Sequence, residues 1–189
     1  MEQSNNIEPN NIEQLNTNLI YPAIKWVGGK TQIIDKIMNK IPLKINTYYE
    51  PFVGGGAVFL RILCDVYKKT RKVNKFCIND INKDLICLYQ DIQTNIEELI
   101  GAVNVYDQMY KNAQTIDYEP RHKYIVNDKS IEDIQKLGKS YVYYYCRDKY
   151  NNMQSCVDKT ALFIFLNKTC FRGLYRIGKT DLTFHLVII

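Results

Sequence analysis

A cluster of glycines at residues 54–56 constrains the fold of this chain more than any other feature. The preceding residues, Thr47–Glu50, are β-prone because they include Tyr48 and Tyr49. The following residues, Ala57–Tyr67, carry apolar side chains at helical spacing. The sequence therefore predicts a strand, a tight turn and a helix in succession. A turn without Cβ atoms lets the backbone approach a ligand closely, and the start of the helix offers free N–H groups.

A second β-prone run, Lys75–Asn79, ends at Asp80. In a doubly wound α/β unit, a carboxylate at the end of the second strand is placed to accept hydrogen bonds from ribose hydroxyls. Asp80 or Asn82 also precedes apolar positions at helical spacing between Leu85 and Ile92, so capping of a helix is the alternative role for either side chain. The two roles of Asp80 are compatible.

Two familiar nucleotide motifs do not fit these glycines. A dinucleotide fingerprint needs a third glycine after Gly54 and Gly56, and Phe59 stands in its place. A P-loop needs a glycine where Ile24 stands, five residues before the Gly29-Lys30-Thr31 triplet. Binding of NAD and hydrolysis of nucleotides are both disfavoured. A phosphate-binding turn at Gly28–Thr31 stays as a remote alternative.

Another turn, Trp26–Lys30, precedes a helical pattern over Gly29–Ile41 that Pro42 ends. The turn is thus predicted at a helix N-terminus. Taken alone, Trp26 could equally be a core aromatic residue and Lys30 a solvated one.

Four segments, in this order and spacing, resemble the Dam-like (D12 class) N6-adenine DNA methyltransferases. They are Lys25–Lys30, Glu50–Gly56, Asn79–Asn82 and Phe165–Arg176. The resemblance implies an α/β, Rossmann-like S-adenosylmethionine-dependent methyltransferase fold, with an incomplete sheet and a mainly helical DNA-recognition insert. It also implies transfer of a methyl group from S-adenosylmethionine to the N6 amine of an adenine flipped out of double-stranded DNA, without a metal ion.

The resemblance also implies which residues bind. Trp26 would pack near the adenine or methionine end of S-adenosylmethionine, Lys30 would meet its carboxylate, and Asp80 would bind its ribose. The full set of cofactor-binding residues is Trp26, Lys30, Glu50, Phe52, Gly54, Gly56 and Asp80. The DNA-binding residues are Asn167, Lys168, Arg172 and Arg176. For Glu50–Gly56, the alternative is an ordinary turn that needs glycine for its backbone angles, with Phe52 in the core.

The family's recognition block commonly shows Asn-Arg and Phe-Asn-Gly, whereas this chain has Asn167-Lys168 and Phe171-Arg172-Gly173. Lysine cannot form the bidentate hydrogen bonds of arginine, which leaves the target sequence open.

The middle of the chain loses the alternation of strand and helix. Apolar spacing predicts helices over Thr94–Asn112 and Ser130–Tyr150, joined by a polar connection at Ala113–Asn127, and a buried helix over Asp158–Asn167. The next block, from Asn167 to Arg176, is expected to expose an amide and several cations to DNA.

Two further groups of residues have a structural and a DNA-binding interpretation. The tyrosines of residues 141–150, flanked by Lys139, Arg147 and Lys149, could face DNA, although packing in the core is the more common role of such a helix. The basic run Lys68–Lys75 is interpreted as a solvated loop, with attraction of DNA as the minority alternative.

The catalytic tetrad of the resembled family, Asp-Pro-Pro-Tyr or a close relative, does not occur in this sequence. The five prolines are isolated from one another, at Pro9, Pro22, Pro42, Pro51 and Pro120. No catalytic residue is therefore assigned. The family places its tetrad after the recognition region, and residues 180–189 do not resemble the family's segment at that position. Premature termination or a frameshift fits this observation, and a C-terminal strand at Leu186–Ile189 fits it as well.

Composition bounds the remaining possibilities. The chain has 189 residues, 46% of them hydrophobic, and a net charge of +5, which permits a DNA partner without requiring one. The six cysteines form no C-x-x-C pair and there are two histidines, so we expect no metal site. No leader or apolar run of ~18 residues is present, so we expect an intracellular protein with no membrane span.

These expectations divide the chain into a disordered arm (1–19), a cofactor-binding part (20–94), a DNA-recognition region (95–179) and an atypical tail (180–189). The expected function is site-specific DNA adenine N6-methylation by a marginally stable chain that lacks the catalytic tetrad. The alternative is a non-catalytic fragment or remnant that binds DNA, S-adenosylmethionine or both.

Overall fold

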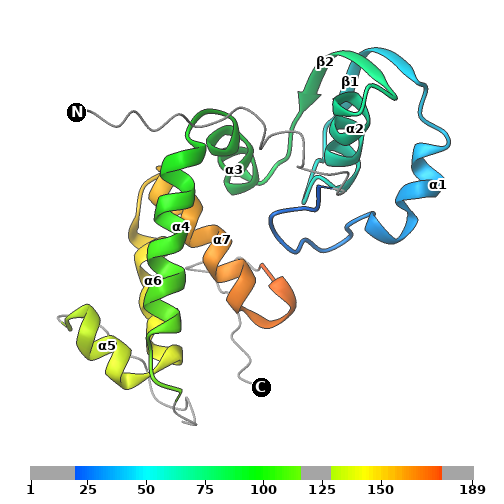
Figure 1. The fold of residues 1–189 in the computed structure, drawn as a ribbon. Helices are drawn as coiled ribbons and strands as arrows, with labels where there is room; N and C mark the ends of the chain where they lie inside the picture. The colour runs from blue at the N-terminus through cyan, green and yellow to red at the C-terminus, as the bar shows by residue number, and fades with distance from the viewer. Residues whose placement is uncertain (1–19, 116–128, 176–189) are drawn as a thin grey trace, which may run out of the picture.

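The computed structural model describes residues 20–115 and 129–175. The predicted arm, most of the polar connection at Ala113–Asn127, and the tail with Arg176 lie outside the described residues. Figure 1 shows a small α/β part, with β1, β2, α1 and α2, beside a helical part that contains α4 to α7. Helix α3 lies between the two parts.

The α/β part is a single strand–helix–strand unit. Strand β1 (Lys44–Glu50) pairs in parallel with β2 (Lys72–Ile78), in a register that runs from Lys44↔Lys72 to Glu50↔Ile78. Helix α2 (Ala57–Tyr67) connects the strands, because parallel neighbours need a crossover. The predicted helix over Ala57–Tyr67 is confirmed.

Both strands begin earlier than the sequence predicted. Lysine and asparagine alternate with Ile45 in β1 and with Val73 in β2, and the alternating side chains point to opposite faces. Because lysine and asparagine are not β-prone, the sequence pattern did not indicate these first residues as strand. Within the described residues the sheet has two strands, covered on one face by α2, where the rings of Phe59 and Phe76 meet at 5.7 Å. The result is a mixed α/β fold with a small parallel sheet.

The helix predicted over Gly29–Ile41 is shorter than expected. A 3-10 turn, η2 (Thr31–Ile33), is followed by α1 (Ile34–Met38). Ile33 has φ −117° and ψ 12°, outside the α-helical range, which divides the predicted helix.

The basic run Lys68–Lys75 is the predicted solvated loop only in its first residues, because Lys68, Lys69 and Thr70 are exposed and lie before β2. Its later residues belong to β2, and Arg71 is only 7% exposed. The Arg71 guanidinium donates to the carbonyls of Ile41 (2.7 Å) and Pro42 and pairs with Asp65 at 3.3 Å. A buried cation needs such partners, so Arg71 serves to fix the end of the α1 segment.

Five α-helices come after the sheet in the described residues. Helices α3 (Lys83–Thr94) and α4 (Ile96–Lys111) precede the undescribed connection, and α5 (Ile131–Leu137), α6 (Lys139–Asn152) and α7 (Val157–Thr169) follow it, with a 3-10 turn η3 at Phe171–Gly173. The helices predicted over Thr94–Asn112 and Asp158–Asn167 are confirmed as α4 and α7. The single helix predicted over Ser130–Tyr150 is divided at Gly138, whose φ of +106° ends α5.

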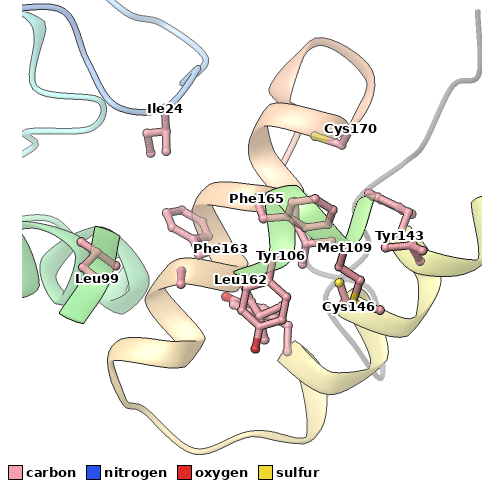
Figure 2. Packing of buried hydrophobic residues seen from close by; sticks show 14 of the residues in the cluster. Ile24, Leu99, Tyr106, Met109, Tyr143, Cys146, Leu162, Phe163, Phe165 and Cys170 are labelled. Carbon is pink, nitrogen blue, oxygen red and sulfur yellow. The ribbon is translucent and has the colours of Figure 1, made fainter. Parts of the chain in front are cut away.

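Helix α7 is the centre of the helical part and packs against α3, α4 and α6. Its side chains from Thr160 to Phe163 are all buried, as are Leu166 and Asn167. Figure 2 shows Leu162, Phe163 and Phe165 of α7 among buried residues of α4 and α6. The same cluster contains Leu85 and Leu88 of α3, so α3 is anchored to the helical part.

The tyrosines of α6 pack in the core. Tyr143 and Tyr150 are fully buried, and Tyr141, Tyr144 and Tyr145 pack at the edge of the same cluster. The flanking cations are engaged within the protein: Arg147 lies 4.5 Å from the Tyr144 ring, and Lys149 lies 3.0 Å from the Asp158 carboxylate. The structural interpretation of these tyrosines is the correct one.

Candidate functional site

The glycine turn between β1 and α2 has the backbone that only glycine adopts easily. Gly54 has φ +52° and Gly56 has φ +78°, both in the left-handed region. A Cβ on Gly54 would lie 3.0 Å from Cδ1 of Trp26, and one on Gly56 would lie 2.4 Å from the Tyr89 hydroxyl. Both the backbone angle and the close neighbours therefore require glycine at these two positions.

Asp80 joins this turn to the start of α3. Its Oδ2 accepts a hydrogen bond from the Gly54 N–H at 2.9 Å, and its Oδ1 accepts one from the Asn82 N–H at 3.0 Å. Asn82 is the N-cap of α3, because its Oδ1 accepts from the backbone N–H groups of Asp84 and Leu85. Of the two residues proposed as a cap, Asn82 has that role and Asp80 holds the glycine turn.

Tyr89 of α3 is a residue of this site that its sequence spacing marked only as an apolar helix position. Its hydroxyl donates to the Gly54 carbonyl at 2.9 Å, and burial raises its pKa. The phenol thus stays protonated and keeps donating. The turn at Gly54 is held on one side by a carboxylate and on the other by a hydroxyl.

A second pair of side chains sits at the end of β1. The Tyr48 hydroxyl donates to Oε2 of Glu50 at 2.7 Å. Burial raises the pKa of the Glu50 carboxyl above its ordinary value, and the bond from Tyr48 opposes that shift. Glu50 is thus a half-buried carboxylate that accepts a hydrogen bond from the Tyr48 hydroxyl, and the backbone of Phe59 also lowers its pKa by hydrogen bonding.

A cavity of about 890 Å³ lies between the two glycine-containing turns. Its walls include residues from the Trp26–Lys30 turn, the end of β1 with the following turn, and the end of β2. All seven residues predicted to bind the cofactor line it: Trp26, Lys30, Glu50, Phe52, Gly54, Gly56 and Asp80. The structure therefore brings together side chains from segments that are far apart in the sequence.

The residues that line the cavity differ in their exposure to solvent and in their contacts with the rest of the protein. Phe52 is 80% exposed and is not the core residue of the alternative interpretation. Lys30 is exposed, and its Nζ donates to the Gly28 carbonyl at 2.7 Å. Trp26 has both of its suggested roles, because it lines the cavity and also packs on the helical part, with its ring 6.3 Å from Phe163 and 5.4 Å from Tyr175.

The predicted DNA-binding block is only partly exposed. Lys168 and Arg172 are exposed, and Arg172 has a positive φ of +54°, which is uncommon for a residue other than glycine. Asn167, however, is fully buried, so the expectation that its amide is exposed to DNA is wrong. It follows Phe163 by one helical turn and thus lies on the inward face of α7, a spacing from which its burial could have been predicted.

Residues 20–115 and 129–175 contain neither a candidate membrane span nor a candidate metal cluster. No helix there is long and apolar enough to cross a membrane. In the same residues, no group of three or more His, Cys, Asp or Glu side chains could hold a metal ion.

The chain is similar to known proteins over most of its length. A family model described as D12 class N6 adenine-specific DNA methyltransferase matches residues 26–184. A type II methyltransferase of Methanocaldococcus jannaschii, M.MjaIII, is 34% identical over 168 residues, which are 85% of this chain and 49% of the relative. DNA adenine methylases of Haemophilus influenzae strain Rd and Escherichia coli strain K12 are 30% and 28% identical, over 82% and 81% of this chain.

The chain spans about half the length of these curated relatives, between 42% and 49%. The match of the family model nevertheless covers most of the chain, including the cavity and the block after α7. This protein therefore belongs to the D12 class of N6 adenine-specific DNA methyltransferases.

Proposed function

We propose that this chain binds S-adenosylmethionine in the cavity between the Trp26–Lys30 turn and the Gly54–Gly56 turn, and that it acts in N6-methylation of adenine in DNA. The observation that carries the proposal is the convergence of seven residues on one cavity. The family implies S-adenosylmethionine as the methyl donor. The size of the cavity is within the usual range for small-molecule sites, about 300–1,000 Å³.

The chemistry of the lining fits this cofactor. S-adenosylmethionine ends in an amino acid group, which carries an ammonium and a carboxylate. The cavity offers an ammonium, Lys30, and a half-buried carboxylate, Glu50. Trp26 and Phe52 add aromatic surface for an apolar or planar group.

Asp80 keeps the capacity to bind a ribose. A carboxylate has about four lone-pair sites, and Asp80 uses its oxygens for one bond each, to Gly54 and Asn82. The same two bonds fix the orientation of the carboxylate. A carboxylate that is already oriented loses less side-chain entropy when ribose hydroxyls donate to it.

The bound cofactor would supply the methyl sulfonium group for the transfer. The residues of this chain would bind and orient it: the glycine turn by close backbone approach, Asp80 and Lys30 by charge. The groups that accept hydrogen bonds from the adenine amine are not assigned, because the sequence contains no Asp-Pro-Pro-Tyr tetrad. Whether the chain transfers methyl groups by itself is therefore separate from whether it binds the cofactor.

The DNA-binding part of the proposal rests on the end of α7 and on η3. Lys168 and Arg172 are exposed there, and exposed cations attract phosphates. Arg176, outside the described residues, would extend this group. Residues 95–179 would then form the helical recognition region, inserted after a Rossmann-like cofactor-binding part at 20–94.

Two measurements separate the methyltransferase from the alternative, a non-catalytic fragment that binds DNA, cofactor or both. The first is calorimetric titration of the chain with S-adenosylmethionine, with ATP and Mg²⁺ as the comparison ligand. The second is transfer of a labelled methyl group to unmethylated double-stranded DNA.

Cofactor binding with methyl incorporation supports the full proposal. Cofactor binding with no incorporation supports the non-catalytic alternative. Binding of ATP with Mg²⁺ but not of S-adenosylmethionine would contradict the cofactor site and favour the phosphate-binding turn at Gly28–Thr31.

A further inference from the structure

A buried amide joins the segment before the Trp26–Lys30 turn to the last turn of α7. Oδ1 of Asn167 accepts a hydrogen bond from the Lys25 N–H at 2.8 Å, and its Nδ2 donates to the Lys25 carbonyl, also at 2.8 Å. The two residues are 142 positions apart in the sequence. One side chain thus satisfies both backbone groups of Lys25, as a neighbouring strand would.

The same amide also binds the turn after α7. Nδ2 of Asn167 donates to the Gly173 carbonyl at 3.2 Å. Gly173 approaches Lys25 so closely that a Cβ on it would lie 2.5 Å from the Lys25 Cβ. Asn167 is fully buried and its bond to the Gly173 carbonyl is buried, so its loss would leave that carbonyl without this donor. Three segments, around Lys25, Asn167 and Gly173, are therefore fixed at one point.

Lys25 itself lines the cavity, as does Trp26. Trp26 follows Lys25, and its carbonyl accepts from the Gly29 N–H at 3.2 Å, which closes the turn. The Trp26 side chain packs on one side against Phe163 of α7, and on the other lies close to Gly54 and Gly55. Figure 2 shows Ile24, which precedes Lys25, among the buried residues that include Phe163. The position of the Trp26–Lys30 turn therefore depends on how its start is held against α7.

We propose that Asn167 is a positioning residue for the cofactor cavity: its buried amide holds the Lys25 backbone and thereby keeps Trp26 and Lys30 facing the glycine turn. This inference rests on the proposed function, because it assigns the cavity to S-adenosylmethionine. It reassigns Asn167 from a contact with DNA to a link between the two parts of the molecule.

The link also has a consequence for DNA. Lys168 follows Asn167 directly, and Arg172 precedes Gly173, so the exposed cations flank the residues that hold Lys25. DNA that binds these cations and stabilises this arrangement raises the affinity for the cofactor. By thermodynamic linkage, the cofactor raises the affinity for DNA by the same factor.

The test measures the fluorescence of Trp26, which reports on the Trp26–Lys30 turn alone because the chain has a single tryptophan. The variant is Asn167→Leu, which keeps the size of the side chain and removes its hydrogen bonds. The matched control is Leu166→Ala, which damages the neighbouring position of α7, also fully buried, without removing a bond to Lys25. Trp26 emission, its quenching by acrylamide, and the Kd for S-adenosylmethionine are measured on chains whose helical circular dichroism is retained.

We expect Asn167→Leu to shift Trp26 emission to longer wavelength, to increase quenching and to raise the cofactor Kd about tenfold, the scale of one lost hydrogen bond. Leu166→Ala should lower stability and leave both readouts close to those of the unmodified chain. Equal emission and equal Kd in Asn167→Leu and the unmodified chain would overturn the proposal. A changed emission with an unchanged Kd would overturn it too, because the turn would then not matter for binding.

If Asn167→Leu does not fold, Gly173→Ala provides the second test. The added Cβ would lie 2.5 Å from the Lys25 Cβ and 3.4 Å from Nδ2 of Asn167, so Lys25 has to move while the amide is retained. It should change Trp26 emission in the same direction, and an unchanged spectrum would refute the link. Should the unmodified chain bind no S-adenosylmethionine, the proposed function fails, and an emission that differs between Asn167→Leu and Leu166→Ala then upholds the structural link alone.

Discussion

Replacement of Gly56 by alanine tests whether the glycine turn is held as the structure indicates. Gly56 has φ +78°, and its added Cβ would lie 2.4 Å from the hydroxyl oxygen of Tyr89. No Cβ tolerates that distance, so the phenol ring has to move. Its hydrogen bond to the Gly54 carbonyl, 2.9 Å long, then breaks. Gly56→Ala therefore lowers stability in two ways: alanine is strained at this positive φ, and the hydrogen bond of Tyr89 is lost.

The two costs have different magnitudes. The left-handed backbone costs an alanine about 1–2 kcal/mol, and the lost hydrogen bond adds about 1 kcal/mol. Gly56→Ala should thus lower the free energy of unfolding by roughly 2–3 kcal/mol. In a Tyr89→Phe background the nearest ring atom is Cζ, at 3.2 Å, which a small shift relieves. There Gly56→Ala should cost only the backbone term, so the two changes couple by about 1 kcal/mol.

The assay is urea unfolding of the two single variants and the double variant, followed by circular dichroism, with the coupling taken from the double-mutant cycle. Gly101→Ala in α4 is the matched control, because Gly101 is exposed and a Cβ there meets nothing within 4 Å. It should raise stability by about 0.5–1 kcal/mol. Additive effects of Gly56→Ala and Tyr89→Phe would refute the contact between these residues.

Three further predictions address the cavity and the DNA-binding surface. Asp80→Ala should weaken S-adenosylmethionine binding by roughly 1.5–3 kcal/mol, the scale of a charge-assisted hydrogen bond, and unchanged affinity by calorimetry in a folded variant would count against the ribose contact. Arg172→Asn should stabilise the chain by up to about 1 kcal/mol, since asparagine tolerates φ +54° better, while the slope of log K for DNA against log salt becomes smaller by about 1; a slope that does not change would exclude a phosphate contact. Because burial raises the pKa of Glu50, the folded chain binds the proton more tightly than the unfolded chain. The free energy of unfolding should fall as pH rises from about 4.5, the ordinary value, to the raised pKa. Glu50→Gln should remove that decrease in pH-dependent urea unfolding, and an identical pH profile would contradict the assignment.

The local features of the cofactor cavity could be predicted from the sequence because they depend on neighbours along the chain. Gly54 and Gly56 mark a turn with positive φ, and the apolar spacing after them predicted α2. Asn82 could be proposed as a cap because an N-cap bonds to N–H groups two and three residues ahead. The resemblance then named seven residues that the structure places along one cavity. That they bind S-adenosylmethionine stays a prediction.

Only the tertiary structure decided which partners the side chains meet. Periodicity indicates that one face of a helix is buried, but not what covers it, so Tyr89 could not be paired with Gly54, nor Arg71 with the end of α1. Asn167 shows the physical reason best. Its amide bonds to the backbone of Lys25, and a hydrogen bond between residues 142 positions apart leaves no local pattern in the sequence. The sequence by itself determined the turns and most of the helices, whereas long-range hydrogen bonds and packing decided which polar residues face the cavity, the core or the solvent.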